Sequence, residues 1–345
     1  MAYTTIDNPF KYFNTVLYSG TGSSNAVTGV GFQPDWVWGK QRSGTNSHEL
    51  YDAVRGVNKI IYSDLTDAEG TNSNGVSAFN ADGFTVAGNT SINLSGESIV
   101  AWNWLAGGTA SSNTDGSITS SVSANTTAGF SIVSYTGNGT DGATIGHGLD
   151  TAPDVLLLKD RDNTRNWRVL HTGYGDASKD CLLNSNAAIA TRADDFNSTY
   201  PSSTLITLGG DAAVNGNTTK YIIYAFSSVK GYSKFGSFTG NGNADGTFVY
   251  TGFKPAFIIG KITSDANEWF LIDNKRSTFN VANKSVYANT SAAENTNHDV
   301  DFLSNGFKIR DSDGTVNVSG GSYIYLAFAE SPFVTAGTKA AGTAR

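Results

Sequence analysis

The chain has 345 residues, only 15% of which are charged, and its formal net charge is −7. Ordinary soluble domains are about 25% charged, so this length and composition indicate a polar, turn-rich β protein of two or three domains. The 23 Lys and Arg are scattered without a run, which argues against a nucleic-acid partner, and no apolar stretch is long enough for insertion into a membrane.

The two ends of the chain are predicted to lie outside its folded units. Residues 1–12 form an N-terminal arm that has neither the basic region nor the apolar region of a signal peptide. Residues 332–345 form a C-terminal tail of similar small and polar composition. We expect both segments to become ordered against neighbouring subunits.

Three similar phrases divide the rest of the chain: "YSGTG" at 18–22, "YTGNG" at 135–139 and "FTGNG" at 238–242. Each is followed by a proline and by a β run that ends in a lysine, namely Lys40, Lys159 and Lys261. Each unit then closes with a turn and a strand, in which we align Trp102, Phe226 and Phe328. Self-similarity of this kind indicates a repeat architecture.

Each repeat is predicted to be a β-sandwich. Short segments rich in Val, Ile, Phe, Tyr and Thr alternate with Gly, Asn and Asp clusters, and no helical periodicity is sustained. The predicted fold is therefore all-β, with three tandem β-sandwich modules (jelly-roll or concanavalin-like) of about 100 residues each. The modules span 13–106, 128–230 and 231–331. Residues 107–127 form a Ser/Thr/Gly linker, whose "GSITSSVS" is able to add an edge strand.

The positions that recur are those of packing and not of catalysis. Trp36, Val155 and Phe257 occupy one aligned position and are apolar in every copy. We therefore expect them to fill three hydrophobic interiors, one in each module. The six Glu and four His do not recur in register, so no catalytic residue is predicted and the chain is not expected to be an enzyme.

Two short motifs resemble ligand sites. "GNGTDG" at 137–142 matches the dinucleotide pattern, but no helix follows it, so we interpret it as a hairpin turn. "KDRDN" at 159–163 and "RDSDGTVN" at 310–317 lack the spacing of a calcium loop, which favours Asx turns over a looser Ca²⁺ site. The histidines and the single cysteine have no zinc spacing, so neither a metal nor a cofactor is predicted.

Two tryptophans are the candidate glycan-binding residues. Trp167 and Trp269 each follow a polar loop, and His48 replaces them in the first repeat. Aromatic rings bind sugars by stacking on their apolar faces, and these two are the candidates for that role. Partial burial at the start of a strand is nevertheless the favoured role for both residues.

The longest phrases resemble a known family. "GFQPDWVWGKQR" at 31–42, "KGYSKFGSFTGNGNADGTFVYTGFKPAF" at 230–257 and "YIYLAFAESPFVT" at 323–335 resemble repeat-bearing proteins of tailed phages that infect marine bacteria, including cyanophages and pelagiphages. The resemblance covers almost the whole chain. It implies concanavalin-like β modules and a virion structural role, and it implies no catalytic residue.

We therefore expect a non-enzymatic structural protein of a phage virion exterior, either a head decoration or a tail or fibre component. It would assemble in the host cytoplasm and leave the cell on lysis. Its expected partners are other virion proteins and further copies of itself. A receptor-binding adhesin that recognises host surface glycans is the alternative, and a polysaccharide depolymerase is less favoured.

Overall fold

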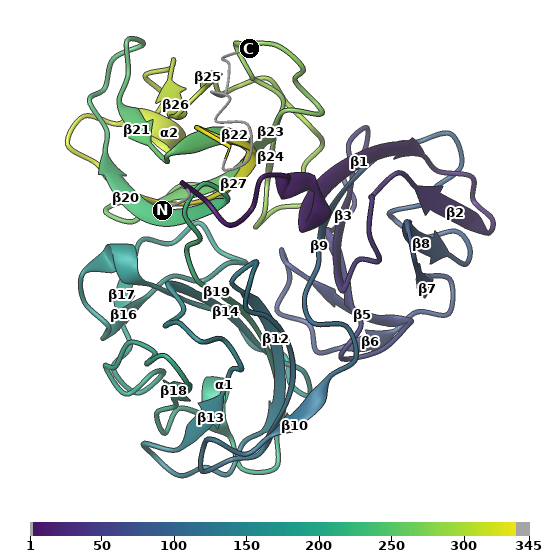
Figure 1. Ribbon diagram of the computed structural model, residues 1–345, viewed down its shortest axis with the longest axis vertical. Helices are drawn as coiled ribbons and strands as arrows, with labels where there is room; N and C mark the ends of the chain where they lie inside the picture. The colour runs from purple at the N-terminus through teal and green to yellow at the C-terminus, as the bar shows by residue number, and fades with distance from the viewer. Residues whose placement is uncertain (1–2, 336–345) are drawn as a thin grey trace.

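The structure is a computed structural model that describes residues 3–335. The chain is all-β, as the sequence predicts, and its strands form antiparallel sheets. Figure 1 shows three groups of strands arranged around a common centre. The helical segments are short turns: η1 (Pro9–Lys11), η2 (Thr172–Tyr174), α1 (Ala212–Asn215) and α2 (Gly314–Asn317).

The first large sheet has the strand order β1-β9-β3-β4-β5-β6, and a smaller sheet, β2-β8-β7, packs on one of its faces. The strands of the large sheet are β1 (Phe13–Ser19), β3 (Trp36–Gln41), β4 (Glu49–Asp52), β5 (Lys59–Tyr62), β6 (Gly70–Thr71) and β9 (Ser98–Trp104). Those of the smaller sheet are β2 (Asn25–Thr28), β7 (Val76–Asn80) and β8 (Gly83–Val86).

The second large sheet has the order β10-β11-β12-β19-β14-β15. Its strands are β10 (Ser111–Asn113), β11 (Ser120–Asn125), β12 (Phe130–Thr136), β14 (Val155–Asp160), β15 (Arg168–His171) and β19 (Lys220–Phe226). Two strand pairs accompany it: β13 (Thr144–Gly146) with β18 (Leu205–Thr207), and β16 (Lys179–Asp180) with β17 (Ala190–Thr191). The predicted linker thus supplies β10 and β11 to the edge of this sheet.

The third large sheet has the order β20-β27-β22-β23-β24, and the smaller sheet β21-β26-β25 packs on it. The large sheet contains β20 (Ser233–Thr239), β22 (Phe253–Ile262), β23 (Phe270–Asp273), β24 (Ser285–Tyr287) and β27 (Ser322–Pro332). The smaller sheet contains β21 (Phe248–Tyr250), β25 (Val300–Leu303) and β26 (Gly306–Ile309).

Strand pairing corrects one of the sequence alignments. Trp36 lies opposite Trp104, Val155 opposite Phe226, and Phe257 opposite Phe328. The counterpart of Phe226 and Phe328 is therefore Trp104 and not Trp102. The closing strand of the first repeat contains two tryptophans, Trp102 and Trp104, and the sequence alignment chose the wrong one. Trp102 lies opposite Trp38 and corresponds to Tyr224 and Leu326.

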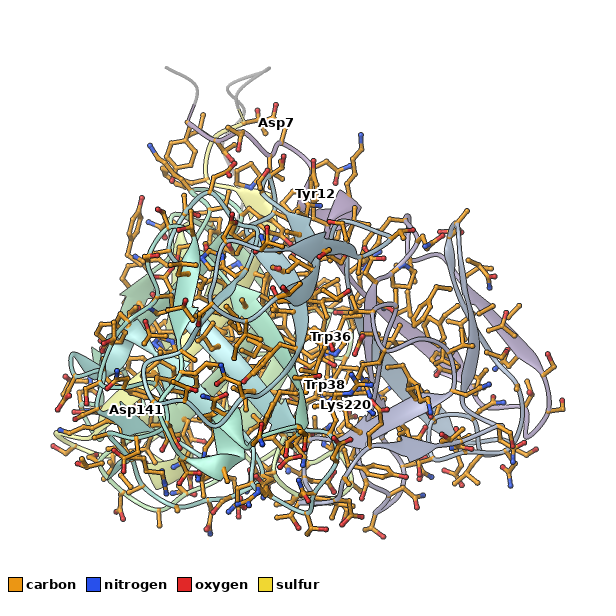
Figure 2. The ribbon with its side chains drawn as sticks, turned by 90° about the horizontal axis from the view of Figure 1, so that it is seen from below. Asp7, Tyr12, Trp36, Trp38, Asp141 and Lys220 are labelled. Atoms are coloured by element: carbon orange, nitrogen blue, oxygen red, sulfur yellow. The ribbon has the colours of Figure 1, made fainter. Side chains whose placement is uncertain are left out.

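The central strands of the large sheets are buried on both faces, and β3, β14 and β22 are buried at every residue. One face of each sheet packs on the smaller strands of its own group. The other faces of all three sheets meet in one central core, where the Trp36 ring stacks on Tyr224 of the second sheet at 4.2 Å between centroids. Figure 2 shows Trp36 and Trp38 inside the molecule.

The central core changes the interpretation of the repeated apolar positions. Trp36, Val155 and Phe257 do share equivalent surroundings, but they belong to this one core and not to three separate interiors. The expectation of one interior for each module is wrong for this face of the sheets. Alternation of apolar residues marks a face as buried, and it does not say which other face covers it.

The described part of the N-terminal arm is held by its own chain. Ile6 is 2% exposed and belongs to the central core, and the Tyr3 hydroxyl donates a hydrogen bond to the carbonyl oxygen of Gly252 at 2.6 Å. The ring of Tyr3 also meets Phe333 at 6.4 Å between centroids. Residues 3–12 are therefore ordered without a neighbouring subunit. The predicted tail lies partly outside the described residues, which end at 335.

Candidate functional site

The same backbone hydrogen bond recurs wherever two large sheets meet. We number the interfaces by the sheets that they join. The amide of Glu69 donates to the carbonyl oxygen of Arg161 at 2.8 Å across the 1–2 interface, and Glu294 donates to Arg42 at 2.8 Å across the 3–1 interface. At the 2–3 interface Ile189 donates to Thr263 at 3.0 Å. These three pairs therefore occupy equivalent places.

At the 1–2 interface this place is filled by one carboxylate between two arginines. Glu69 accepts hydrogen bonds from Arg161 at 2.9 and 3.1 Å, and the Nη1 atom of Arg55 lies 3.4 Å from its Oε2 atom. Arg55 is itself buried, pairs with Asp52 and donates to the carbonyl oxygen of Leu50 at 3.0 Å. The charged groups thus bridge the first and second sheets.

The 3–1 interface repeats this arrangement. Glu294 accepts hydrogen bonds from Arg42 at 2.8 and 2.9 Å, and the Nη1 atom of Arg276 lies 3.5 Å from its Oε2 atom. Arg276 pairs with Asp273 at 2.5 Å and donates to the carbonyl oxygen of Leu271 at 3.0 Å. Two of the three interfaces therefore carry the same charged triad of Glu and two Arg.

The 2–3 interface has no charge at the equivalent positions. Tyr174 stands three residues after His171, as Arg55 stands three residues after Asp52. Its hydroxyl donates to the carbonyl oxygen of Val169 at 3.2 Å, which matches the arginine-to-Leu50 bond of the 1–2 interface. Ile189 and Thr263 complete the uncharged triad.

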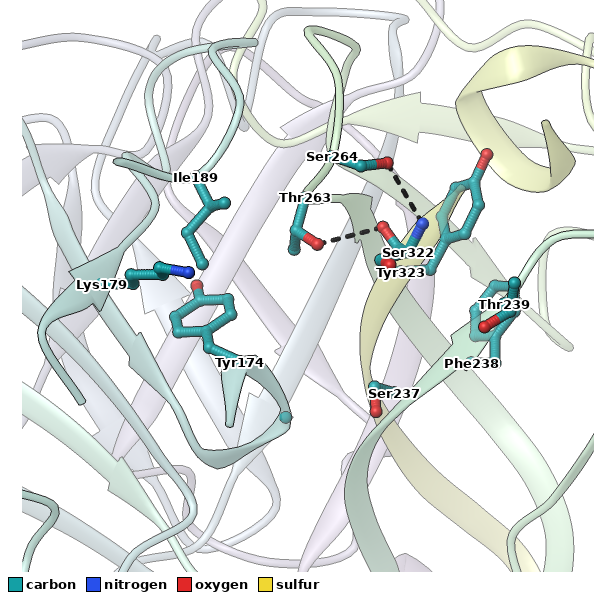
Figure 3. Close-up of a pocket in the computed structure, with 11 residues that line it drawn as sticks. Tyr174, Lys179, Ile189, Ser237, Phe238, Thr239, Thr263, Ser264, Ser322 and Tyr323 are labelled. Atoms are coloured by element: carbon teal, nitrogen blue, oxygen red, sulfur yellow. Dashed lines mark hydrogen bonds between the residues drawn. The ribbon is translucent and has the colours of Figure 1, made fainter. Parts of the chain in front are cut away.

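A cavity of about 430 Å³ occupies this interface and is bordered by all three members of the uncharged triad (Figure 3). Seven of its eleven lining residues are Ser, Thr or Tyr. The lining residues are Gly173, Tyr174, Lys179, Ile189, Ser237, Phe238, Thr239, Thr263, Ser264, Ser322 and Tyr323. We call this cavity the 2–3 pocket.

Hydrogen bonds within the third group of strands hold one wall of the pocket in place. The Thr263 hydroxyl donates to the carbonyl oxygen of Ser322 at 3.1 Å, and the amide of Ser322 donates to the Ser264 hydroxyl oxygen at 3.1 Å (Figure 3). Lys179 is the one charged side chain of the lining, and its ammonium lies 3.7 Å from the carboxylate of Asp176. Burial raises the pKa of Tyr174 well above its usual value, so its hydroxyl stays protonated. The wall is therefore polar and close to neutral.

The two tryptophans singled out from the sequence do not line this pocket. Trp167 and Trp269 are both 0% exposed, so neither ring has a face on which a sugar could stack. Trp167 donates through Nε1 to the carbonyl oxygen of Tyr62 at 2.8 Å, and Trp269 donates to that of Leu182 at 3.0 Å, each across an interface. The glycan-binding expectation for these two residues is therefore wrong.

His48, which aligns with the two tryptophans, makes the equivalent contact across the 3–1 interface. Its Nε2 atom lies 3.0 Å from the carbonyl oxygen of Tyr287, and its Nδ1 atom accepts a hydrogen bond from Trp38 at 2.8 Å. The three aligned side chains thus tie each sheet to the next. In the sequence, the alignment of these three positions was the signal that could have indicated this role.

The other sequence motifs are turns and caps. Asp160 accepts hydrogen bonds from the amides of Asp162 and Asn163 at 2.9 Å each, and Asp313 caps α2 through the amide of Thr315 at 2.7 Å. The glycine motif at 137–142 leads into β13 and not into a helix. Among residues 3–335, no group of three or more His, Cys, Asp or Glu is placed to hold a metal ion. Within the same range, no helix is long and apolar enough to span a membrane.

The fold and the pocket define an all-β protein whose three large sheets enclose one aromatic core. The chain belongs to the DUF7483 family, described as a domain of unknown function, whose model matches residues 8–332. That single match runs through all three large sheets. Comparisons with curated proteins and with solved structures gave no match.

Proposed function

We propose that the chain is a non-enzymatic structural protein of a tailed-phage virion exterior, built from three tandem β-sandwich modules of about 100 residues. The observation that carries the structural role is the shared core. Three large sheets with the same order of central strands bury one face each against a single aromatic cluster. Such a unit resists deformation, because no sheet can move without opening the core of the others.

The interfaces between the sheets support the same role. Charged triads at two interfaces and three aligned indole or imidazole contacts join each sheet to its neighbours. Each of the three interfaces is thus held by side-chain hydrogen bonds in addition to the shared core. The resemblance of the sequence to marine phage proteins supports the location on a virion, as a head decoration or as a tail or fibre component.

Quantitative mass spectrometry of purified phage particles tests this function. We expect the chain at a fixed ratio to the major capsid protein through successive density gradients. Isotope-labelled purified chain, added to the lysate before purification, controls for adsorption and is expected to be lost. Recovery of the encoded chain only in the soluble fraction would contradict the proposal.

A further inference from the structure

We propose that the 2–3 pocket binds a neutral sugar residue. This inference goes beyond the structural role and does not depend on where the protein resides. It rests on the comparison of the three interfaces, on the chemistry of the pocket wall and on the access of solvent to it. The pocket contains neither Trp167 nor Trp269.

The first argument is that the pocket lies where the other two interfaces hold charged side chains. Glu69 and Glu294 fill their interfaces with two arginines each, whereas Ile189 at the 2–3 interface has no such partners. Well-packed apolar side chains of similar volume can replace a buried ion pair with no loss of stability. Here Thr263 and the hydroxyl-bearing residues around it leave about 430 Å³ open. A pocket open to solvent adds no side-chain contacts across the interface, so packing between the sheets does not account for it.

The second argument is the hydrogen-bonding character of the wall. A hydroxyl group both donates and accepts, so a wall of hydroxyl groups complements a ligand whose groups also do both. The Ser264 oxygen accepts a hydrogen bond from the backbone and keeps its own proton to donate. The Tyr174 hydroxyl donates to the backbone and keeps lone pairs to accept. Sugar hydroxyls have this dual character, and carboxylates or ammonium ions do not.

The charge of the wall also favours a neutral ligand. Lys179 is its single cation and already faces the carboxylate of Asp176, so little net field remains to select an anion. A nearly neutral wall of hydroxyl groups therefore suits the polar edge of a sugar ring.

The third argument is access and size. Ser237, Thr239, Ser264 and Ser322 are exposed, so the pocket opens to solvent. Its volume lies within the range of roughly 300–1,000 Å³ that is typical of small-molecule sites. A free monosaccharide or the end of a longer glycan is therefore able to enter.

Titration with D-glucose, D-galactose, D-mannose and N-acetylglucosamine, followed by NMR, tests the proposal. We expect at least one of these sugars to bind at millimolar concentration and to shift resonances of the pocket residues. The double variant Ile189→Glu, Thr263→Arg rebuilds the Glu–Arg pair of the other interfaces and fills the pocket. Sugar affinity should fall at least tenfold in this variant while Tm stays equal or rises.

Further variants separate binding from folding. Ser264→Ala removes one exposed hydroxyl and should weaken binding several-fold even if the double variant fails to fold. Thr136→Leu changes a separate polar hollow beside Arg161 and Lys220 and should leave binding unchanged. Absence of binding by all four sugars, equal binding by the Ser264 variant, or binding of inorganic phosphate in place of sugar would overturn the proposal. Incorporation of the double variant into phage particles would test the structural role independently of sugar binding.

Discussion

The lysines that end the repeated β runs show how single residues serve this fold. Lys40, Lys159 and Lys261 are fully buried, and each ammonium donates to backbone carbonyl oxygens. Lys40 also reaches the carbonyl oxygen of Ser291 in the third group of strands at 3.1 Å. Burial lowers the pKa of all three lysines to about 8. These cations are held by backbone carbonyl dipoles in all three repeats, which gives their repetition a structural explanation.

His171 gives a residue-scale prediction at the 2–3 interface. Its Nδ1 atom accepts a hydrogen bond from the amide of Gly173 at 2.8 Å, and its Nε2 atom lies 3.2 Å from the carbonyl oxygen of Tyr325. Burial lowers the pKa of His171 to about 4, against about 6.5 in the unfolded chain. Between these values only the unfolded chain takes up the proton. The folded state therefore loses stability as the pH falls from about 6.5 towards 4.

Urea titrations at pH 7 and pH 5 measure this loss, which we expect to be about 2 kcal/mol from His171 alone. In His171→Gln, the difference in the free energy of unfolding between the two pH values should shrink by that amount. The other buried histidines contribute equally to both proteins, so they cancel in the comparison. An unchanged difference in the variant would show that His171 does not titrate as proposed.

At the scale of elements, the side chains that pack over the central strands of the large sheets limit which residues these strands can carry. Strands β3 and β22 carry Gly39 and Gly260 at a position where β14 carries Leu158. The Phe270 ring lies over Gly260, and a Cβ atom there would come within 2.3 Å of its Cζ atom. Glycine at this position is therefore required by close packing and not by an unusual backbone conformation.

Gly260→Ala is expected to lower the free energy of unfolding by about 1–3 kcal/mol, because the added methyl group overpacks the third group of strands. Gly210→Ala is the matched control, since its Cβ atom would lie 3.6 Å from the nearest atom, an ordinary contact. That control should stay within about 0.5 kcal/mol of the wild type. Urea midpoints at equal m value provide the comparison, and equal midpoints for both variants would contradict the packing argument.

At the scale of the whole molecule, the central core makes the three groups of strands depend on one another. Trp36 contacts Tyr224 and Phe226 of the second sheet, and Phe13 contacts Phe257 and Phe328 of the third. A single group removed from the others would expose this entire apolar face to water. The free-energy cost grows with the apolar area exposed, at roughly 25 cal/mol per Å².

The fragment 128–230, one of the units predicted from the sequence, is therefore not expected to fold alone. Circular dichroism and thermal unfolding of this fragment should show no cooperative transition, or should show aggregation. The full chain should unfold in one transition, because its groups share a core. A soluble fragment with a native-like spectrum and its own sharp transition would contradict this expectation.

Much of the fold was accessible from local sequence patterns. Apolar alternation and turn residues are local signals, and they identified the all-β class and the burial of Trp36, Val155 and Phe257. The departure of "HTGYG" at 171–175 from "DAVRG" at 52–56 and "DNKRS" at 273–277 was also visible in the sequence. Its consequence was not visible, because nothing local shows what Tyr174 meets.

By itself, the sequence determined the all-β class, the positions that repeat and the burial of Trp36, Val155 and Phe257. Only the tertiary structure decided that the repeated faces share one core, that Trp104 and not Trp102 lies opposite Trp36, and that Trp167 and Trp269 are closed to ligands. The 2–3 pocket also belongs to the tertiary structure, since Tyr174, Ile189 and Thr263 lie far apart in the chain. Periodicity indicates whether a residue is buried, whereas the residues that bury it are determined by contacts between distant segments.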